Sequence, residues 1–343
     1  MHSRVRLMSA LLAGCGCAWL STQQLASQAP ATGQGGPGGR GGPPQQYWVQ
    51  KTKGGVYIPP NKPLTKLADL KAKYRGPSWN EVVIKDTELQ AEYHSAPAGT
   101  KVSPRFHPGT VSVFVVFEGE MRWQVENQQP FTAKRGSVVN IPPFTMFSFE
   151  IVSTNPALWI DVQPVHFDTV FPVDSPAPPA CPGAVLTKIA FNRRAAAYVA
   201  PNQPHWNLHD SVKANPERPG GVQVLTDHMY ANANYGFADP NDPLNPNRGN
   251  PAGRGRGGPP ADSGPFDPKV PFGHLHAGSA EWWIVLVGHI SGKFETGEVI
   301  GAEGDVLYAP PYTWHQMANS GAGASCRFTF GAYDPVNFAV VRE

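Results

Sequence analysis

The chain has 343 residues, of which 36 are Gly and 37 are Pro, and its formal net charge is +2 at pH 7. This length is sufficient for two domains with buried cores. Outside the Gly- and Pro-rich stretches there is no cluster of basic residues, which argues against a nucleic-acid-binding protein. We therefore expect a globular protein with no nucleic-acid partner.

Residues 1–20 have the features of an export signal. Two arginines precede an apolar run that ends at Leu20 and is too short and too rich in small residues for a membrane span. The segment Leu12-Ala13-Gly14-Cys15 is similar to the lipoprotein box of bacteria, which would make Cys15 a lipid-anchored residue. The alternative is an ordinary signal peptide cleaved near residues 26–29. We expect export from a bacterial cytoplasm, to the periplasm, to a membrane anchor or to the medium.

Residues 21–46 are rich in Gly, Pro, Gln and Ser. Such a composition cannot bury enough apolar surface to compensate for the entropy lost on ordering, so it predicts a flexible tether. An RNA-binding Arg-Gly segment is the alternative, and the export signal directly before it disfavours that function.

Residues 47–165 are expected to form a first domain built mainly of strands. After an irregular, Pro-containing start, a short helix is expected within residues 62–73. Strands then begin at residues 81–93, a hairpin follows over residues 113–125, and residues 136–142 form a further strand and turn.

Residues 166–220 contain several prolines and are predicted to link two domains. Within them, residues 189–199 are expected to form a strand or a short helix. His205, Trp206 and His209 make a cluster that we interpret as a packing and capping feature, with a second metal site as the alternative.

Residues 221–343 are expected to form a second β domain. It contains an insertion at residues 239–268 that is rich in Pro, Gly, Asn and Arg. Because the insertion directly precedes a strand-like segment, it should leave one rim of the domain. There it would act as a mobile lid or have no function of its own.

Two short motifs after the insertion supply four candidate metal ligands. His274 and His276 are two residues apart on a strand-like segment, so their side chains project the same way. Glu281 follows a Gly-Ser turn, and His315 opens another strand after the turn at Pro310. Three imidazoles and one carboxylate form a mixed nitrogen and oxygen set that suits Mn, Fe, Cu, Ni or Zn.

The spacing of these motifs, H-x-H-x4-E-x6-G and then G-x5-P-x4-H-x3-N, resembles that of the cupin superfamily. The matching residues are His274, His276, Glu281, Gly288, Gly304, Pro310, His315 and Asn319. Tyr312 stands where the family usually has Gly, a departure that affects a turn and not a ligand. The resemblance implies that the three histidines and Glu281 bind one divalent metal inside a small β-barrel. Glu281 is also the candidate catalytic residue, because a carboxylate that swings off the metal can accept a proton.

The first domain parallels the second and forms an internal repeat with it. In this alignment Arg105, Ser112 and Phe147 stand at three of the four ligand positions, and only His107 remains. We therefore expect a metal-free first barrel that supports the second. The alternative is a pocket in which Arg105 binds an acidic ligand.

The fold implied by the resemblance is all-β, with two jelly-roll cupin barrels in one chain after the signal region and the tether. Proteins with two such barrels resemble a head-to-head pair of protomers fused together. The outer sheet of the first barrel should therefore cover that of the second and bury apolar faces that a single copy would expose.

The four cysteines include no C-x-x-C pair, which disfavours a zinc site built from thiolates. Cys181 and Cys326 would form a disulfide in an oxidising compartment. Two buried free thiols are the alternative.

Strand alternation suggests what surrounds the metal. Trp283 is in phase with Glu281, and Met317 is in phase with His315. Together with Phe328 and Phe330 from the last strand, they are expected to form a mostly apolar substrate pocket. Such a lining suits an aromatic or weakly polar substrate better than a small dianion such as oxalate.

Cupins with three histidines and a glutamate resemble one another across several activities. They include Mn-dependent oxalate oxidases and decarboxylases, dioxygenases with Cu, Fe or Ni, and lyases or isomerases. Our first hypothesis is an exported, metal-dependent oxidoreductase with two cupin barrels, a dioxygenase acting on a small organic, for example phenolic, substrate. The alternatives are a non-catalytic cupin that binds a metal or small ligand, and a metal-dependent lyase, decarboxylase or isomerase. Retention of all four ligands favours an enzyme.

Overall fold

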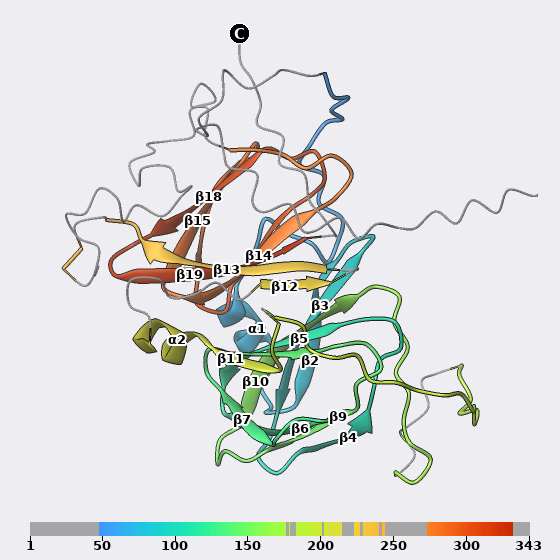
Figure 1. Ribbon diagram of the computed structural model, residues 1–343. Coiled ribbons are helices and arrows are strands. Elements are labelled where there is room, and N and C mark those ends of the chain that lie inside the picture. The colour runs from blue at the N-terminus through green and yellow to red at the C-terminus, as the bar shows by residue number, and fades with distance from the viewer. Residues whose placement is uncertain are drawn as a thin grey trace, which may run out of the picture. The chain divides into compact units, whose positions relative to one another are not determined.

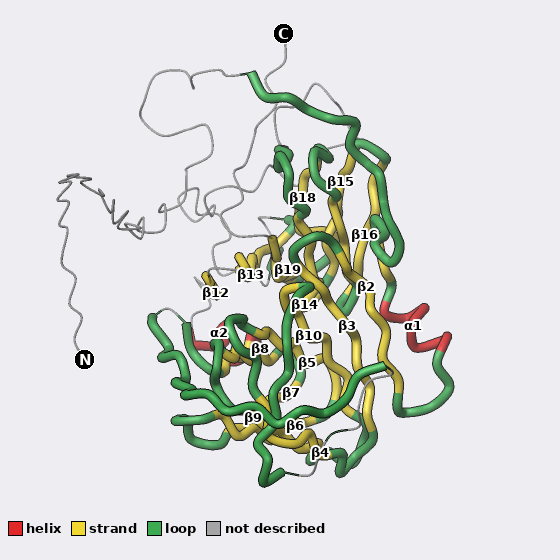
Figure 2. Tube along the Cα trace, turned by 90° about the vertical axis from the view of Figure 1, so that its right-hand side faces the viewer, coloured by secondary structure: helices red, strands yellow, loops and turns green. Residues whose placement is uncertain are grey.

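The structure is a computed structural model, in which the described residues are 48–175, 178, 183–200, 202–214, 223–226, 229–239, 242–243 and 273–331. The predicted signal, Cys15, the tether, Cys181 and most of the predicted insertion lie outside them. The described residues form long antiparallel strands and two short helices (Figures 1 and 2), which confirms the prediction of an all-β fold. None of the helices among them is long and apolar enough to cross a membrane.

The first barrel consists of a six-stranded sheet and a four-stranded sheet. In spatial order the large sheet contains β11 (His205–Asn207), β8 (Ser137–Ile141), β5 (Ser112–Glu118), β10 (Ala157–Pro164), β3 (Leu89–Ala96) and β2 (Trp79–Lys85). The small sheet contains β4 (Lys101–Arg105), β9 (Phe147–Ile151), β6 (Glu120–Val125) and β7 (Phe131–Lys134). An aromatic core fills the space between them, with Trp123 lying 4.5 Å from Phe149 between ring centroids.

The second barrel repeats this design with a six-stranded and a three-stranded sheet. Its large sheet contains β1 (Leu64–Thr65), β17 (Val306–Ala309), β14 (Glu281–Val287), β19 (Ala324–Gly331), β13 (Met229–Phe237) and β12 (Gln223–Thr226). Its small sheet contains β16 (Gly297–Ala302), β15 (His289–Phe294) and β18 (His315–Ser320).

The two copies exchange a strand and a helix. Strand β1 and the helix after it, α1 (Leu67–Lys73), precede the first copy, yet β1 pairs with β17 of the second barrel. Strand β11 and the helix after it, α2 (Leu208–Ala214), precede the second copy, yet β11 pairs with β8 of the first barrel. Leu67 and Leu208 are the first residues of the two helices, and each is bound to the opposite barrel by its backbone N–H. The N–H of Leu67 donates to Asp305 Oδ1 and that of Leu208 to the Gly136 carbonyl, each at 2.9 Å.

The exchanged strands pair across the predicted domain limits. The start of the predicted first domain, residues 47–165, contributes β1 to the second barrel, and the predicted linker, residues 166–220, contributes β11 to the first. The internal repeat therefore includes the strand–helix unit as well as the barrel strands.

The two large sheets pack face to face, as predicted for a fused pair of barrels. On β14, Trp282 and Ile284 face this interface, whereas Trp283 and Val285 face the interior of the second barrel. Facing side chains on the first barrel include Val115. Because both faces of β14 are buried, the strand is apolar at nearly every position.

The prediction of a strand or short helix over residues 189–199 is wrong, since these residues belong to no regular element. Side-chain contacts hold this segment instead. Arg193 donates to Glu126 Oε1 at 2.8 Å, and the Phe191 ring lies 6.0 Å from that of Phe106.

Candidate metal centre

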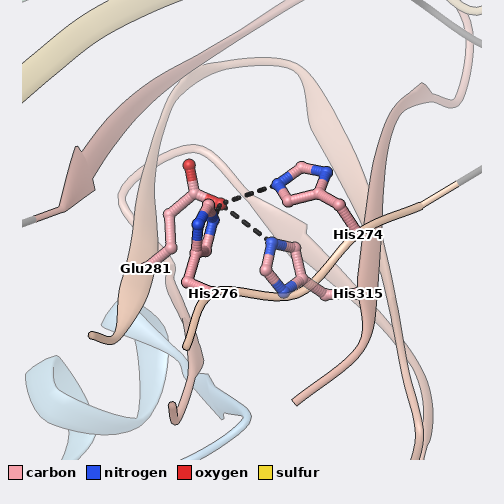
Figure 3. A group of neighbouring side chains, drawn as sticks. All are labelled: His274, His276, Glu281 and His315. Atoms are coloured by element: carbon pink, nitrogen blue, oxygen red, sulfur yellow. Dashed lines mark hydrogen bonds and ion pairs between the residues drawn. The ribbon is translucent and has the colours of Figure 1, made fainter. Parts of the chain in front are cut away.

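Four predicted ligands meet at one end of the second barrel (Figure 3). Their donor atoms all lie within 4.8 Å of one another. Glu281 Oε2 is 2.8 Å from His315 Nε2, 3.0 Å from His276 Nε2 and 3.5 Å from His274 Nε2. The three imidazoles therefore direct the same nitrogen toward a single carboxylate oxygen.

Local backbone structure holds the two motifs together. His274 and His315 form an isolated antiparallel bridge, in which each N–H donates to the carbonyl of the other at 3.0 and 2.9 Å. Gly273, with φ of +139°, permits this approach, because a side chain there would collide with the Trp314 ring and the His315 carbonyl. The N–H of Tyr312 donates to the His276 carbonyl at 2.8 Å, which fixes the second histidine to the same turn.

Tyr312 itself has a φ of +61°, in the left-handed region that favours glycine. This explains why cupins usually have Gly at that position. The equivalent residue of the first copy, Phe144, has a φ of +58°. Both turns keep the same backbone conformation despite an aromatic side chain.

Burial and hydrogen bonding set the charges of the site. Burial disfavours ionisation of Glu281, but its contacts with His274, His276 and His315 outweigh burial and hold its pKa well below the usual range. Burial also lowers the pKa of His315, against the opposing influence of Glu281. The site therefore combines an ionised Glu281 carboxylate with a His315 imidazole whose neutral form is favoured, and this is the state that metal ligands require.

The arrangement fits a cation between the four side chains. The Nδ1 of His315 lies 2.9 Å from the Thr313 carbonyl, so a neutral imidazole uses its single N–H there. Its Nε2 then presents a lone pair to Glu281 Oε2 at 2.8 Å, and two lone pairs at this distance repel unless a cation lies between them. In addition, the buried Nε2 of His274 has no hydrogen-bond partner among the described residues.

The distances suit a transition metal. Ligand atoms bound at about 2.1 Å to one ion lie roughly 3 to 4 Å apart, and the distances from Glu281 Oε2 to the three imidazole nitrogens, 2.8, 3.0 and 3.5 Å, are close to this range. Three nitrogens and one oxygen match the preferences of Mn, Fe, Cu, Ni and Zn, and this donor set does not select among those metals.

Two of the predicted pocket residues lie beside the site. Trp283 projects from β14 on the same face as Glu281, and its ring centroid is 5.1 Å from that of His315. Met317 is two residues beyond His315 on β18 and packs against the cluster that contains Trp283.

The prediction that Phe328 and Phe330 line the pocket is wrong. They pair with Ile284 and Trp282, whose side chains face the first barrel, and the Phe330 ring stacks on Trp282 at 4.4 Å. Because strand side chains alternate, the residues of β19 that face the barrel interior are Arg327 and Thr329. The inward face of β19 is therefore more polar than expected for an apolar substrate pocket.

The first barrel has the same frame with different residues. Arg105 pairs with Phe147 there, as His274 pairs with His315 in the second barrel, so the alignment of the repeats is confirmed. The Arg105 guanidinium lies 5.0 Å from the centre of the Phe171 ring, and its Nε donates to the Ser103 carbonyl at 3.1 Å.

A second group of acidic and imidazole side chains lies on the inward face of the large sheet of the first barrel. His94 Nε2 is 3.2 Å from Asp161 Oδ2 and 3.8 Å from Glu92 Oε2. The His94 ring also stacks on Trp159. These contacts describe an ion-paired cluster on β3 and β10, and its Asp161 acts electrostatically on Arg105 and His107, which stand at two of the positions that correspond to the metal ligands.

Two histidines of residues 166–220, the segment predicted to be a linker, pack against the first barrel. His205 stacks on Phe131 with ring centroids 4.7 Å apart, and its Nε2 is 2.9 Å from Ser137 Oγ. His209 lies over Gly136. Neither belongs to a possible metal-binding group within the described part of the chain. Cys326 is buried and forms no disulfide with a described residue.

Comparisons with known proteins agree with this structure. Residues 92–163 and 266–331 match the family model described as "Cupin domain". The structure of salicylate 1,2-dioxygenase from Pseudaminobacter salicylatoxidans is similar, with a TM-score of 0.50 and 12% identity over 78% of this chain and 82% of that one. No curated protein sequence matches the chain.

Two further solved structures match with lower scores. They are a cupin 2 conserved barrel domain protein from Leptotrichia buccalis (TM-score 0.45, 10% identity, 82% of this chain and 97% of that one) and an oxalate decarboxylase from Bacillus subtilis (0.41, 12%, 74% and 71%). At such identities the likeness concerns the fold. The two barrels, their metal motif and the two family matches show that the chain belongs to the cupin superfamily. With two cupin domains, it is a bicupin.

Proposed function

We propose that the protein is a metal-dependent bicupin oxidoreductase, a dioxygenase that acts on a small organic substrate such as a phenolic molecule. The observation that carries this proposal is the convergence of His274, His276, Glu281 and His315 on one point. These side chains would hold a divalent transition metal, which would supply Lewis-acid chemistry for a substrate and for dioxygen.

The protein side chains define how a substrate reaches this point. The side chain of His274 is 30% exposed, whereas those of His276 and His315 are 2% and 1% exposed, so His274 is the candidate ligand nearest to solvent, although its Nε2 is buried. Trp283 gives the buried side an aromatic wall that excludes water and packs against a flat substrate. Glu281 is the candidate proton acceptor, because a carboxylate that leaves the metal can take a proton from the substrate.

Dioxygen consumption tests the proposal. The protein loaded with Fe, Mn, Cu or Ni is incubated with a panel of phenolic substrates, and uptake of dioxygen is measured together with product. We expect one metal form to consume dioxygen with a substrate, and a His276→Ala and His315→Ala double variant to lose this activity. The matched control is a His205→Ala and His209→Ala double variant, which removes two imidazoles away from the site and should retain it.

The other outcomes identify the alternatives. Product formation without dioxygen would indicate a lyase, decarboxylase or isomerase. Tight ligand binding with no turnover by any metal form would indicate a binding protein. Either result would contradict the dioxygenase proposal while leaving the metal site in place.

We also propose that the reaction takes place outside the cytoplasm, with Cys15 as a lipid anchor. The support is the signal-like composition of residues 1–20 and the Leu12-Ala13-Gly14-Cys15 segment. Labelled fatty acid should be incorporated into the parent protein and not into a Cys15→Ser variant. Export without lipid incorporation would favour the ordinary signal peptide.

A further inference from the structure

The inward face of the second large sheet carries a strip of polar residues. Asn232 pairs with Thr329 and Asn234 pairs with Arg327 across β13 and β19. Thr329 also pairs with Trp283 on β14, so all of these side chains lie on the face that carries Glu281. We call Asn232, Asn234, Arg327 and Thr329 the polar strip; the adjoining interior wall, which includes Trp283, is apolar.

Arg327 forms no ion pair with a described residue, and the nearby carboxylate of Glu281 acts on its guanidinium only through its electrostatic field. The Nε of Arg327 is buried and has no hydrogen-bond partner among the described residues. Burial lowers the pKa of this guanidinium, against the field of Glu281, but an arginine stays protonated in proteins. A partly buried cation without an ion-pair partner is unfavourable, so this position suits an anionic ligand.

The remaining residues of the strip make it accessible and polar. Asn234 is exposed, and its Nδ2 donates to Asn232 Oδ1 at 2.8 Å and to Thr329 Oγ1 at 3.3 Å. A ligand can therefore reach Arg327 from solvent, beside amide and hydroxyl groups that complete the hydrogen bonding of an anion.

The position of Arg327 also limits the size of the ligand. Its partner on β14, Val285, is four residues beyond Glu281, which corresponds to about 13 Å of strand. The Trp283–Thr329 pair lies between the two ends. A ligand that contacts both Arg327 and the metal ligands would pass the Trp283–Thr329 pair, and an acid with an aromatic body spans more of this length than a two-carbon dianion does.

The fold alone does not require this strip. At the equivalent positions of the first barrel, Glu92 pairs with Asp161 and His94 pairs with Trp159. The same face is thus acidic in one copy and carries an arginine in the other, although the strands and their pairing are alike. The difference assigns the cationic strip to the barrel that holds the candidate metal ligands.

We propose that Arg327, with Asn234 and Thr329, forms an anion subsite that binds the carboxylate of an organic acid whose opposite end reaches the ligands of the candidate metal centre. This inference rests on the proposed function, because the bound acid is taken to be the substrate of the metal centre. It names the class of substrate, which is aromatic or similarly sized carboxylic acids.

Binding of matched acids and amides tests the subsite. The probes are benzoate, 4-hydroxybenzoate and 3-phenylpropanoate, each compared with its neutral amide, and binding to the metal-loaded protein is measured by calorimetry. We expect at least one acid to bind at least tenfold more tightly than its amide. Arg327→Met should abolish this preference, and Arg327→Lys should retain part of it. The control, Arg75→Met, removes an exposed guanidinium on the first copy and should leave the preference unchanged.

Metal content and thermal unfolding of each variant keep the test specific. We expect Arg327→Met to bind as much metal as the parent. If Arg327→Met does not fold, an Asn234→Leu and Thr329→Val double variant replaces it in the test, and this variant must weaken the preference for the acid over the amide at least threefold. A metal-loaded parent that prefers no acid over its amide, or a folded Arg327→Met variant that keeps the preference, overturns the subsite and leaves the proposed function standing. A parent that binds no metal but still prefers the acid contradicts the proposed function and supports the subsite.

Discussion

Replacement of Glu281 by Gln should remove most of the stabilisation that a bound metal gives to the protein. The side chain of Glu281 is 9% exposed, and its Oε2 is the atom on which three imidazole nitrogens converge. The substitution keeps the shape of the side chain but removes the negative charge. Since ligands must be deprotonated to bind a metal well, the neutral amide is a poor substitute.

The size of the effect follows from binding linkage. A metal present at 100 times its dissociation constant raises the free energy of unfolding by about 2.7 kcal/mol. If loss of the carboxylate weakens binding about 100-fold, the same metal concentration adds only about 0.4 kcal/mol. For a chain of this size the first value corresponds to a rise in melting temperature of roughly 4 °C, and the second to less than about 1 °C.

The assay is thermal unfolding of the parent and of Glu281→Gln with and without each metal. Glu150→Gln is the matched control, because this carboxylate pairs with Arg122 on the surface of the first barrel, and its response should equal that of the parent. An equal rise in melting temperature for Glu281→Gln and the parent would refute the reasoning, since Glu281 would then not be a ligand.

Three further predictions concern the frame of the molecule. Leu208→Ala in the exchanged unit, where the side chain is 1% exposed, should cost about 3 kcal/mol of unfolding free energy in urea, whereas Val185→Ala, at 84% exposed, should change it by less than about 0.5 kcal/mol. Equal effects would contradict the packing of the exchanged helix. Tyr312→Gly should raise the free energy of unfolding by up to about 1 kcal/mol, because glycine adopts the left-handed conformation without strain, and a lower melting temperature would disprove this. Burial lowers the pKa of His107 in the folded protein. Below about pH 6.5 the unfolded chain therefore binds a proton at this residue that the folded protein does not bind, and the free energy of unfolding decreases as the pH is lowered. Urea unfolding of His107→Gln between pH 7 and 5 should lack this part of the pH dependence; an unchanged slope would count against it.

The metal motif could be predicted because its information is local. His274 and His276 are fixed by strand alternation, and the turns around Gly273 and Tyr312 bring His315 to them through one backbone bridge. The spacing within each motif therefore determines the geometry, and the fold joins the two halves.

The faces of the last strand could not be assigned so easily. Alternation divides β19 into two sets but does not say which set faces the barrel interior. Phe328 and Phe330 were the more apolar set, and the large apolar surface lies between the barrels rather than inside the second one. The signal that was missed is Arg327, a charged residue in a buried strand, in phase with Thr329.

The exchange of strand–helix units was beyond local reasoning as well. Strand β1 has two residues and pairs with a strand more than two hundred residues later, Leu64 with Leu307. Neither composition nor periodicity specifies such a partner. The exchange becomes recognisable as a feature of both copies when the hydrogen bonds of Leu67 and Leu208 are compared in the structure.

The most direct test of the metal centre is the metal content of the protein, purified without a metal-affinity tag, beside the His276→Ala and His315→Ala double variant. We predict about one equivalent of Fe, Mn, Cu, Ni or Zn in the parent, taken up on reconstitution if lost in purification, and almost none in the variant. A variant that retains the metal would place the site elsewhere in the chain. A parent that binds no metal after reconstitution would contradict the account.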